Sequence, residues 1–443
     1  MTTIGSNQSG NTSISRVELA IYAGAIVVAA AIYGSIYFKR APTPTAPQVF
    51  EPLTGVAEPL TNQLAVLDIR HQLWLVDPTT GHRERLTRDG EYCELPSWSP
   101  DDAYLAYING ASEGRHGINI ISPSNHTEYQ VLKPQGFNPY FLNWSPDGHF
   151  LAYSASFGER VRFCAVLGLV DKSPSFELSR GPSVYWQWSP DSRSILWNQS
   201  GELNLTTVKN WDRKKKLTPS FDAFTTPAWG KETGSFVYAR GAEGPPSLIL
   251  GRDPGQSGRY LYTADFRLTM TTSRDRARLA ILEMQRKPRS RVPGPIAIVS
   301  LDEERPTVHF PIEAYAFFWS PNHRYLAALT RHVDPDPNRT AIHSLVPPDT
   351  VEASQACWWI LDTETGDMTP LIQFVPTHNF MGAANRVSQI QSAHNIWSPD
   401  GTQIVLGALE ADRHTSTIWL VAVSGEEAPR SLGDGSIATW TWH

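Results

Sequence analysis

The sequence has few of the residues that mark disulfide-stabilised, metal-binding or nucleic-acid-binding proteins. Among 443 residues there are three cysteines, Cys93, Cys164 and Cys357, which lie far apart and without C-x-x-C spacing. This pattern predicts no disulfide framework, zinc ribbon or haem attachment, so we expect three buried thiols that act as small apolar side chains. The net charge of −6 argues against a nucleic-acid partner.

Catalytic and metal-binding motifs are also scarce. Residues 110–114 match G-x-S-x-G, but a nucleophilic serine needs a strand-to-helix turn, and Ser112 falls in a hairpin between two expected strands. Asp334, Asp336 and Asn338 have the spacing of calcium ligands, yet Arg339 stands where a calcium loop needs glycine, which leaves an irregular cation site or a plain acidic loop. Four histidines in or beside the same region lack a metal-binding spacing: His332, His343, His378 and His394. We therefore expect no enzyme, no cofactor and no metal.

One stretch is long and apolar enough to cross a membrane. Leu19 to Phe38 carries no charge and is closed by Lys39 and Arg40, so we predict a single transmembrane helix over residues 17–38, with a cleaved signal peptide as the alternative. Small residues four apart on this stretch would let a partner helix approach closely, or simply reflect common membrane composition: Ala20, Gly24, Ala30 and Gly34.

The rest of the chain divides around this helix. Residues 1–16 are polar and predicted to be disordered, residues 39–61 are a proline-rich linker, and residues 62–443 form the globular domain. The basic residues that flank the helix slightly favour a cytoplasmic domain.

The globular domain is organised around a repeated phrase, Trp-Ser-Pro-Asp, followed by an apolar strand. It begins at Trp98, Trp144, Trp188, Trp319 (with Asn322 in place of Asp) and Trp397, with eroded copies at Trp229 and Thr272. Each copy reads as a strand end, a tight turn and a strand start, in which Trp is a packing residue. A period of about 40 to 45 residues with four short strands is typical of β-propeller blades.

The two ends of the domain complete one blade. Three strands at residues 64–87 have no Trp-Ser-Pro-Asp before them, and residues 436–442 supply a strand after the last repeat. Pairing these segments closes the ring and leaves no open sheet edge. We therefore predict an all-β propeller of eight four-stranded blades, with seven as the alternative if one eroded copy is not a blade.

Three neighbouring blades carry insertions that leave the same face. They are residues 284–294, 331–355 and 376–395, each after a second or fourth strand. Long loops on a rigid scaffold are common binding sites, although they can also be insertions without a role. The predicted partner-binding residues are Arg286, Lys287, Arg289, Arg291, Asp334, Asp336, Arg339, His378 and Phe380.

The Trp-Ser-Pro-Asp-Gly phrase at Trp144 and Trp397 resembles the repeat of TolB-like propellers, which are related to WD repeats. The resemblance covers residues 63–442 and implies a bacterial, extracytoplasmic protein. Enzymes with related propellers carry a hydrolase domain after the propeller, whereas here the closing strand stands at the end of the chain.

The repeat is specific for a fold and says little about function. We expect a membrane-anchored, non-catalytic interaction or assembly module, an accessory subunit bound to an integral-membrane protein. The alternative is a ligand-binding or hydrolase-related protein that works through the central channel.

Overall fold

The computed structural model describes residues 51–443, except 112–114, 134–135, 158–160, 171–172, 182–183, 220–225, 241–246, 253–256, 264–266, 288–289, 293, 303–304, 332–340, 348–349, 351–353, 385–386 and 413. The predicted transmembrane helix, with Ala20, Gly24, Ala30 and Gly34, lies outside these residues. Within the described ranges, no helix has the length and apolar character needed to cross a bilayer.

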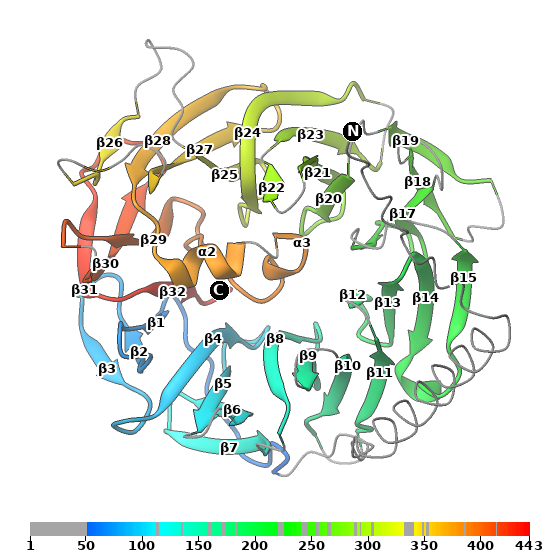
Figure 1. The fold of residues 1–443 in the computed structure, drawn as a ribbon, viewed down its shortest axis with the longest axis horizontal. Helices are drawn as coiled ribbons and strands as arrows, with labels where there is room; N and C mark the ends of the chain where they lie inside the picture. The colour runs from blue at the N-terminus through cyan, green and yellow to red at the C-terminus, as the bar shows by residue number, and fades with distance from the viewer. Residues whose placement is uncertain are drawn as a thin grey trace, which may run out of the picture. The chain divides into compact units, whose positions relative to one another are not determined.

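The described residues form sheets that follow one another around a ring (Figure 1), antiparallel except for one short parallel pair in the longest sheet, which confirms the all-β prediction. Five sheets have four strands. They are β32 (Ile437–Trp440) with β1 (Leu64–Leu67), β2 (Leu73–Val76) and β3 (Arg83–Arg85); β4 (Tyr92–Trp98), β5 (Leu105–Ala111), β6 (Arg115–Ser122) and β7 (Thr127–Leu132); β8 (Asn138–Trp144), β9 (Phe150–Phe157), β10 (Val161–Gly168) and β11 (Phe176–Arg180); β12 (Val184–Trp188), β13 (Ser194–Gln199), β14 (Glu202–Thr207) and β15 (Lys215–Pro219); and β16 (Ala228–Trp229), β17 (Phe236–Arg240), β18 (Ser247–Gly251) and β19 (Arg259–Thr263). A single 3-10 turn, Val208–Asn210, follows β14.

The remaining strands form one long and one short sheet. The long sheet contains β20 (Arg267–Thr272), β21 (Arg278–Lys287), β22 (Ser290–Val292), β23 (Gly294–Ser300), β24 (Val308–Trp319), β25 (Tyr325–Arg331), β26 (His343–Ser344), β27 (Ala356–Asp362) and β28 (Met368–Phe374). The short one contains β29 (Gln403–Leu409), β30 (Ser416–Ala422) and β31 (Arg430–Asp434). The twelve residues of β24 pair with β23 through their first part and with β25 through their second, so this strand joins two repeats.

The first and last strands close the ring as predicted. Leu64 to Leu67 of β1 pair antiparallel with Trp440 to Ile437 of β32. Asp102, whose side chain is 1% exposed, reinforces this closure. One carboxylate oxygen accepts the backbone N–H of Trp442 at 2.7 Å, and the other accepts the N–H of His443 at 2.8 Å. Burial raises the pKa of Asp102, and the two N–H groups oppose that rise.

Each Trp-Ser-Pro-Asp turn is held by the same two side chains. In the turn after β4, the Ser99 hydroxyl donates to Asp101 at 2.5 Å and accepts the N–H of Tyr104 at 2.9 Å. The pattern recurs around the ring, including the eroded copy at Ser273, where the hydroxyl bonds Asp275 at 2.5 Å and accepts the N–H of Arg278 at 3.1 Å. The residue after the aspartate has a positive φ, which explains glycine at 148 and 401.

The repeated tryptophans join neighbouring repeats. In five of them the indole N–H donates to a backbone carbonyl of the preceding repeat, at the residue just before that repeat's own Trp position or its equivalent. The pairs are Trp98 to Thr439 (3.2 Å), Trp144 to Ser97 (3.0 Å), Trp229 to Gln187 (3.3 Å), Trp319 to Thr271 (3.4 Å) and Trp397 to Phe318 (3.1 Å). Trp188 departs from the series, because its buried indole nitrogen has no partner in the described part of the chain.

This series predicts a difference between two otherwise similar substitutions. Trp144→Phe removes an indole together with its hydrogen bond to the carbonyl of Ser97, and we expect it to lower the free energy of unfolding by about 1 to 2 kcal/mol more than Trp188→Phe. Both variants lose similar ring volume, so packing largely cancels in the comparison. Urea unfolding of the two proteins measures the difference, and equal losses would contradict an interblade role for the hydrogen bond.

The interior follows the sequence expectations for the thiols. Cys93, Cys164 and Cys357 are all buried, and none of them forms a disulfide. Burial raises the pKa of the Cys93 thiol to about 12, so this sulfur stays protonated and unreactive.

The described end of the predicted linker, residues 51–61, is attached to the propeller by backbone hydrogen bonds. Leu53 donates its N–H to the Leu169 carbonyl at 2.8 Å, and Leu60 donates its N–H to the Asp102 carbonyl at 3.1 Å.

Candidate functional site

The insertion at 376–395 differs from a surface loop. It forms two short helices, α2 (His378–Ala384) and α3 (Val387–Ile390), and α3 contacts the inner strands β12, β20 and β24. Figure 1 shows both helices inside the ring of sheets. The segment is drawn inward because its apolar side chains are buried there, among them Phe380, Ile390 and Ala393.

Hydrogen bonds fix the last part of this insertion to several sheets. The Gln391 side chain donates to the Phe317 carbonyl at 2.7 Å, and Asn143 donates to the Ser392 hydroxyl at 2.7 Å. Asn395 bonds the carbonyl of Thr441 at 3.0 Å. The segment 389–395 is therefore a plug that connects the long sheet, the β8 sheet and the closing strand.

A pocket of about 620 Å³ lies where the roots of two insertions meet. Its wall includes both ends of the 331–355 insertion and the start of the 376–395 insertion. The lining residues are Tyr315, Leu329, Arg331, Ser354, Gln355, Ala356, Val375, Pro376, His378, Met381, Gly382 and Leu409. We call this site the insertion pocket; it gathers on one face two of the three segments that the sequence identified.

The insertion pocket combines an apolar wall with two nitrogen-bearing side chains. The guanidinium of Arg331 lies 6.0 Å from the ring centroid of Tyr315, within reach of a cation–π contact. His378 is exposed, and its helix also supplies the half-buried Met381. The lining residues include no Asp or Glu, so an apolar side chain next to a carboxylate would fit this surface best.

The predicted binding residues are distributed unevenly. His378 lies at the insertion pocket, whereas Phe380 is 3% exposed and packs against Trp358 with ring centroids 5.8 Å apart. The backbone at Arg286, Lys287 and Arg291 belongs to a ribbon in which β21 pairs with β22, but the described structure does not cover their side chains. Arg289, Asp334, Asp336 and Arg339, and also Ser112 and His332, lie outside the described residues.

Sequence reasoning missed Tyr315 and Met381. Neither belongs to a motif, and each reaches the pocket only through the fold: Tyr315 lies midway along β24, and Met381 lies on a helix inside a segment that was interpreted as a loop. One signal could have found the helix: Thr377 directly precedes α2, and its hydroxyl accepts the N–H of Phe380 at 3.2 Å as a helix N-cap does.

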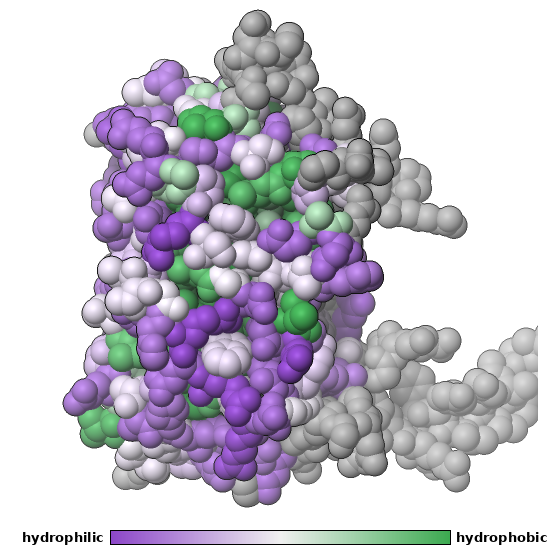
Figure 2. Space-filling model, turned by 90° about the vertical axis from the view of Figure 1, so that its left-hand side faces the viewer, coloured by the Kyte–Doolittle hydropathy of each residue, from purple (hydrophilic) through white to green (hydrophobic). Residues whose placement is uncertain are grey.

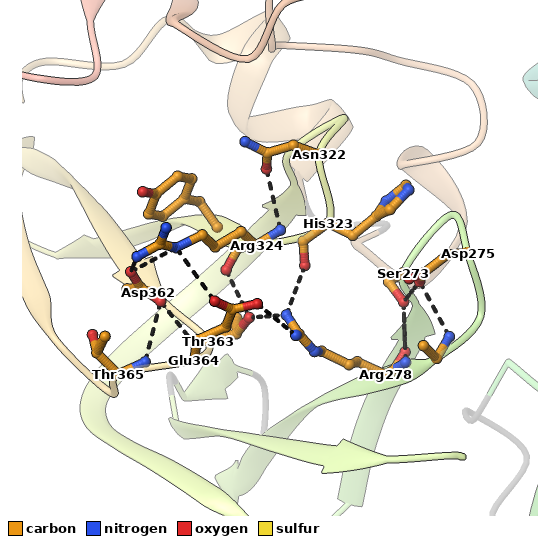
Figure 3. A network of polar contacts seen from close by, with 12 residues as sticks. Ser273, Asp275, Arg278, Asn322, His323, Arg324, Asp362, Thr363, Glu364 and Thr365 are labelled. Atoms are coloured by element: carbon orange, nitrogen blue, oxygen red, sulfur yellow. Dashed lines mark hydrogen bonds and ion pairs between the residues drawn. The ribbon is translucent and has the colours of Figure 1, made fainter. Parts of the chain in front are cut away.

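A cluster of charged side chains between the turns of the long sheet could be mistaken for a site (Figure 3). Arg278 donates to the Thr363 hydroxyl at 2.8 Å and pairs with Glu364 at 2.9 Å, and Arg324 pairs with Asp362 at 2.7 Å. Burial tends to raise the pKa of Asp362, but the Arg324 guanidinium and the backbone N–H groups of Glu364 and Thr365 together lower the pKa below its ordinary value. These groups satisfy one another and join two repeats, so they are structural.

Comparisons with known proteins agree with the fold. No protein-family model matches the chain. The Tol-Pal system protein TolB of Alcanivorax borkumensis is 34% identical over 116 residues, which are 25% of this chain and 26% of TolB, so the match spans about a quarter of that relative. Within the described residues, no group of three or more His, Cys, Asp or Glu side chains could hold a metal.

Solved structures support the architecture alone. A dihydro-haem d1 dehydrogenase, NirN, aligns over 92% of this chain and 84% of its own with a TM-score of 0.55 and 14% identity. A eukaryotic initiation factor aligns over 86% of this chain and 99% of its own with a TM-score of 0.52 and 13% identity. The repeated Trp-Ser-Pro-Asp turns, the ring of sheets and the similarity to TolB over a quarter of the chain show a β-propeller that resembles TolB.

Proposed function

We propose that the chain is a membrane-anchored, non-catalytic β-propeller that captures a protein partner through the insertion pocket. The insertion pocket is the observation that carries this proposal, because it joins two insertions and has an apolar wall edged by Arg331 and His378. The similarity to TolB, which is named as a protein of the Tol-Pal system, supports an interaction or assembly role.

The same proposal includes eight blades and a single membrane span. Eight blades result when the long sheet is counted as two blades that share β24 and Trp397 is counted as the inner edge of the last blade, where it bridges Ile404. The uncharged run within residues 17–38 would anchor the propeller, and an extracytoplasmic location follows from the TolB-like repeat. The partner would then be an integral-membrane protein, with this chain as an accessory subunit.

The outer flank of the ring is a less suitable contact surface. Figure 2 shows that the flank with β30 and β31 is mostly hydrophilic, with apolar residues in small patches separated by polar ones. Interfaces are commonly built around a central apolar anchor that excludes water. The wall at Met381, Leu329 and Val375 offers such a centre.

A photo-crosslinking experiment in cells tests the proposed partner site. Benzoylphenylalanine at position 378, at the rim of the insertion pocket, is expected to label one integral-membrane protein, whereas the same group at position 56, where Val56 is 91% exposed, is not. Met381→Glu should reduce the labelling at position 378 about tenfold, because it places a charge in the apolar wall.

The matched control is Val56→Glu, which adds the same charge at an exposed apolar position. It should leave the labelling at position 378 unchanged. Equal labelling from positions 56 and 378, or full labelling in the Met381→Glu protein, would exclude the insertion pocket as the partner site. Extraction of membranes with alkaline carbonate, which should release a 47–443 fragment but not the full chain, tests the anchor separately.

A further inference from the structure

A second pocket lies among the Trp-Ser-Pro turns, at the opposite ends of the strands from the insertion pocket. Its volume is about 340 Å³, which is within the range of sites for small molecules. Six indole rings and three prolines line it: Trp98, Trp144, Trp188, Trp319, Trp397, Trp442, Pro100, Pro146 and Pro321. We call it the tryptophan pocket.

The lining of the tryptophan pocket is held in place by contacts within the protein. Five of the six indoles donate a hydrogen bond to a backbone carbonyl, for example Trp144 to Ser97 and Trp397 to Phe318. The plug supplies Gln391, Ser392, His394 and Asn395 to the lining. A ligand would therefore enter a preorganised site and would not have to order a loop on binding.

The charge of the tryptophan pocket has one sign. Arg274 is its one lining side chain with a full charge, and its lining residues include no Asp or Glu. The exposed guanidinium of Arg274 bonds the His443 ring at 3.3 Å and has no ion pair in the described part of the chain. His394 is neutral at pH 7, because burial lowers its pKa to about 4.

Three lining residues have an unused polar atom. The indole nitrogen of Trp188, the hydroxyl of Thr271 and Nε2 of His394 are buried and have no hydrogen-bond partner among the described residues. Buried polar groups in folded proteins nearly always have a partner, so a ligand or ordered water in this pocket would satisfy groups that the described residues leave unpaired.

The lining restricts the class of ligand. Indole faces favour a flat aromatic body, and they would also attract a quaternary ammonium ion, but Arg274 repels a cation and the lining holds no carboxylate to attract one. An anion of the same shape would gain a charge-assisted hydrogen bond from the guanidinium. We propose that the tryptophan pocket binds a small aromatic carboxylate, with its ring among the indoles and its carboxylate on Arg274.

Three probes of equal shape test this proposal on the full chain in detergent: naphthalene-2-carboxylate, its carboxamide and 2-naphthylmethylammonium. Quenching of tryptophan fluorescence reports binding, because six of the indoles line the site. The carboxylate is expected to bind about tenfold more tightly than either other probe. Arg274→Gln should remove this preference and still bind the carboxamide.

Arg193→Gln is the control, since Arg193 is an exposed arginine in the corresponding turn after β12 and does not line the pocket. It should bind all three probes as the unmodified chain does. Absence of saturable carboxylate binding at millimolar concentration, equal affinity for the carboxylate and the ammonium, or an unchanged preference in the Arg274→Gln protein would each overturn the proposal. None of these results depends on the partner site at the insertion pocket.

Discussion

Asp102→Asn is expected to lower the free energy of unfolding by about 3 kcal/mol, because both carboxylate oxygens of Asp102 accept backbone N–H groups of the closing segment. An asparagine has one acceptor oxygen, so its NH₂ group would face a backbone N–H and leave it unpaired in the interior. The closing segment would then keep its pairing with β1 and its bonds to Trp98 and Asn395, but it would lose the clamp on its last two residues. Urea unfolding at neutral pH measures the loss.

Asp101→Asn is the matched control for this prediction. Asp101 accepts the Ser99 hydroxyl and the Ala103 N–H through the same oxygen, Oδ1, which an asparagine retains. We expect the control to cost less than about 1 kcal/mol. If the two variants lose similar stability, the clamp on Trp442 and His443 does not hold the ring closed.

The repeat made most of the fold predictable. Serine and aspartate at fixed positions of a tight turn form the same local hydrogen bonds wherever they occur, so sequence alone indicates a strand on each side. Even the copies without the full phrase are in register, since Trp229 ends β16 and Thr272 ends β20. The pairing of the first and last strands was also predictable, because an unpaired sheet edge is costly.

The second role of the tryptophans was not predictable. They were interpreted as packing residues, but their indole N–H groups also donate to carbonyls in the preceding sheet. Those acceptors are backbone atoms, which any residue supplies. No pattern of side chains in the sequence therefore predicts these hydrogen bonds.

The plug was missed for a different reason. Its helices are short, with seven residues in α2 and four in α3, and helices of this length depend on tertiary packing rather than on their own propensity. The inward course of the chain is specified by long-range partners such as Phe317 for Gln391 and Thr441 for Asn395. The segment's position between two strands indicated a surface insertion. Its inward course depends on partners that come together only once the ring has folded.

The plug also contains the residue for which we expect the strongest response to acid. Burial lowers the pKa of His394 from 6.5 to about 4 in the folded chain, with no charged partner to offset it. The folded state therefore disfavours the proton that the unfolded state binds. Stability due to this group is complete above about pH 6.5 and is lost as the pH falls towards 4, by about 3 kcal/mol in total.

His394→Leu should remove this loss, because leucine has a similar volume and cannot be protonated. At pH 7 the variant is expected to be as stable as the unmodified chain or slightly more so, since Nε2 of His394 has no hydrogen-bond partner among the described residues. At pH 4.5 the variant should be more stable than the unmodified chain by about 2 kcal/mol.

Phe380→Leu is the control, because it changes a buried apolar side chain of the same insertion. It should lower the free energy of unfolding equally at both pH values. Urea unfolding of the three proteins at the two pH values measures these differences. If the His394→Leu variant loses as much stability in acid as the unmodified chain does, the proton is taken up by another residue.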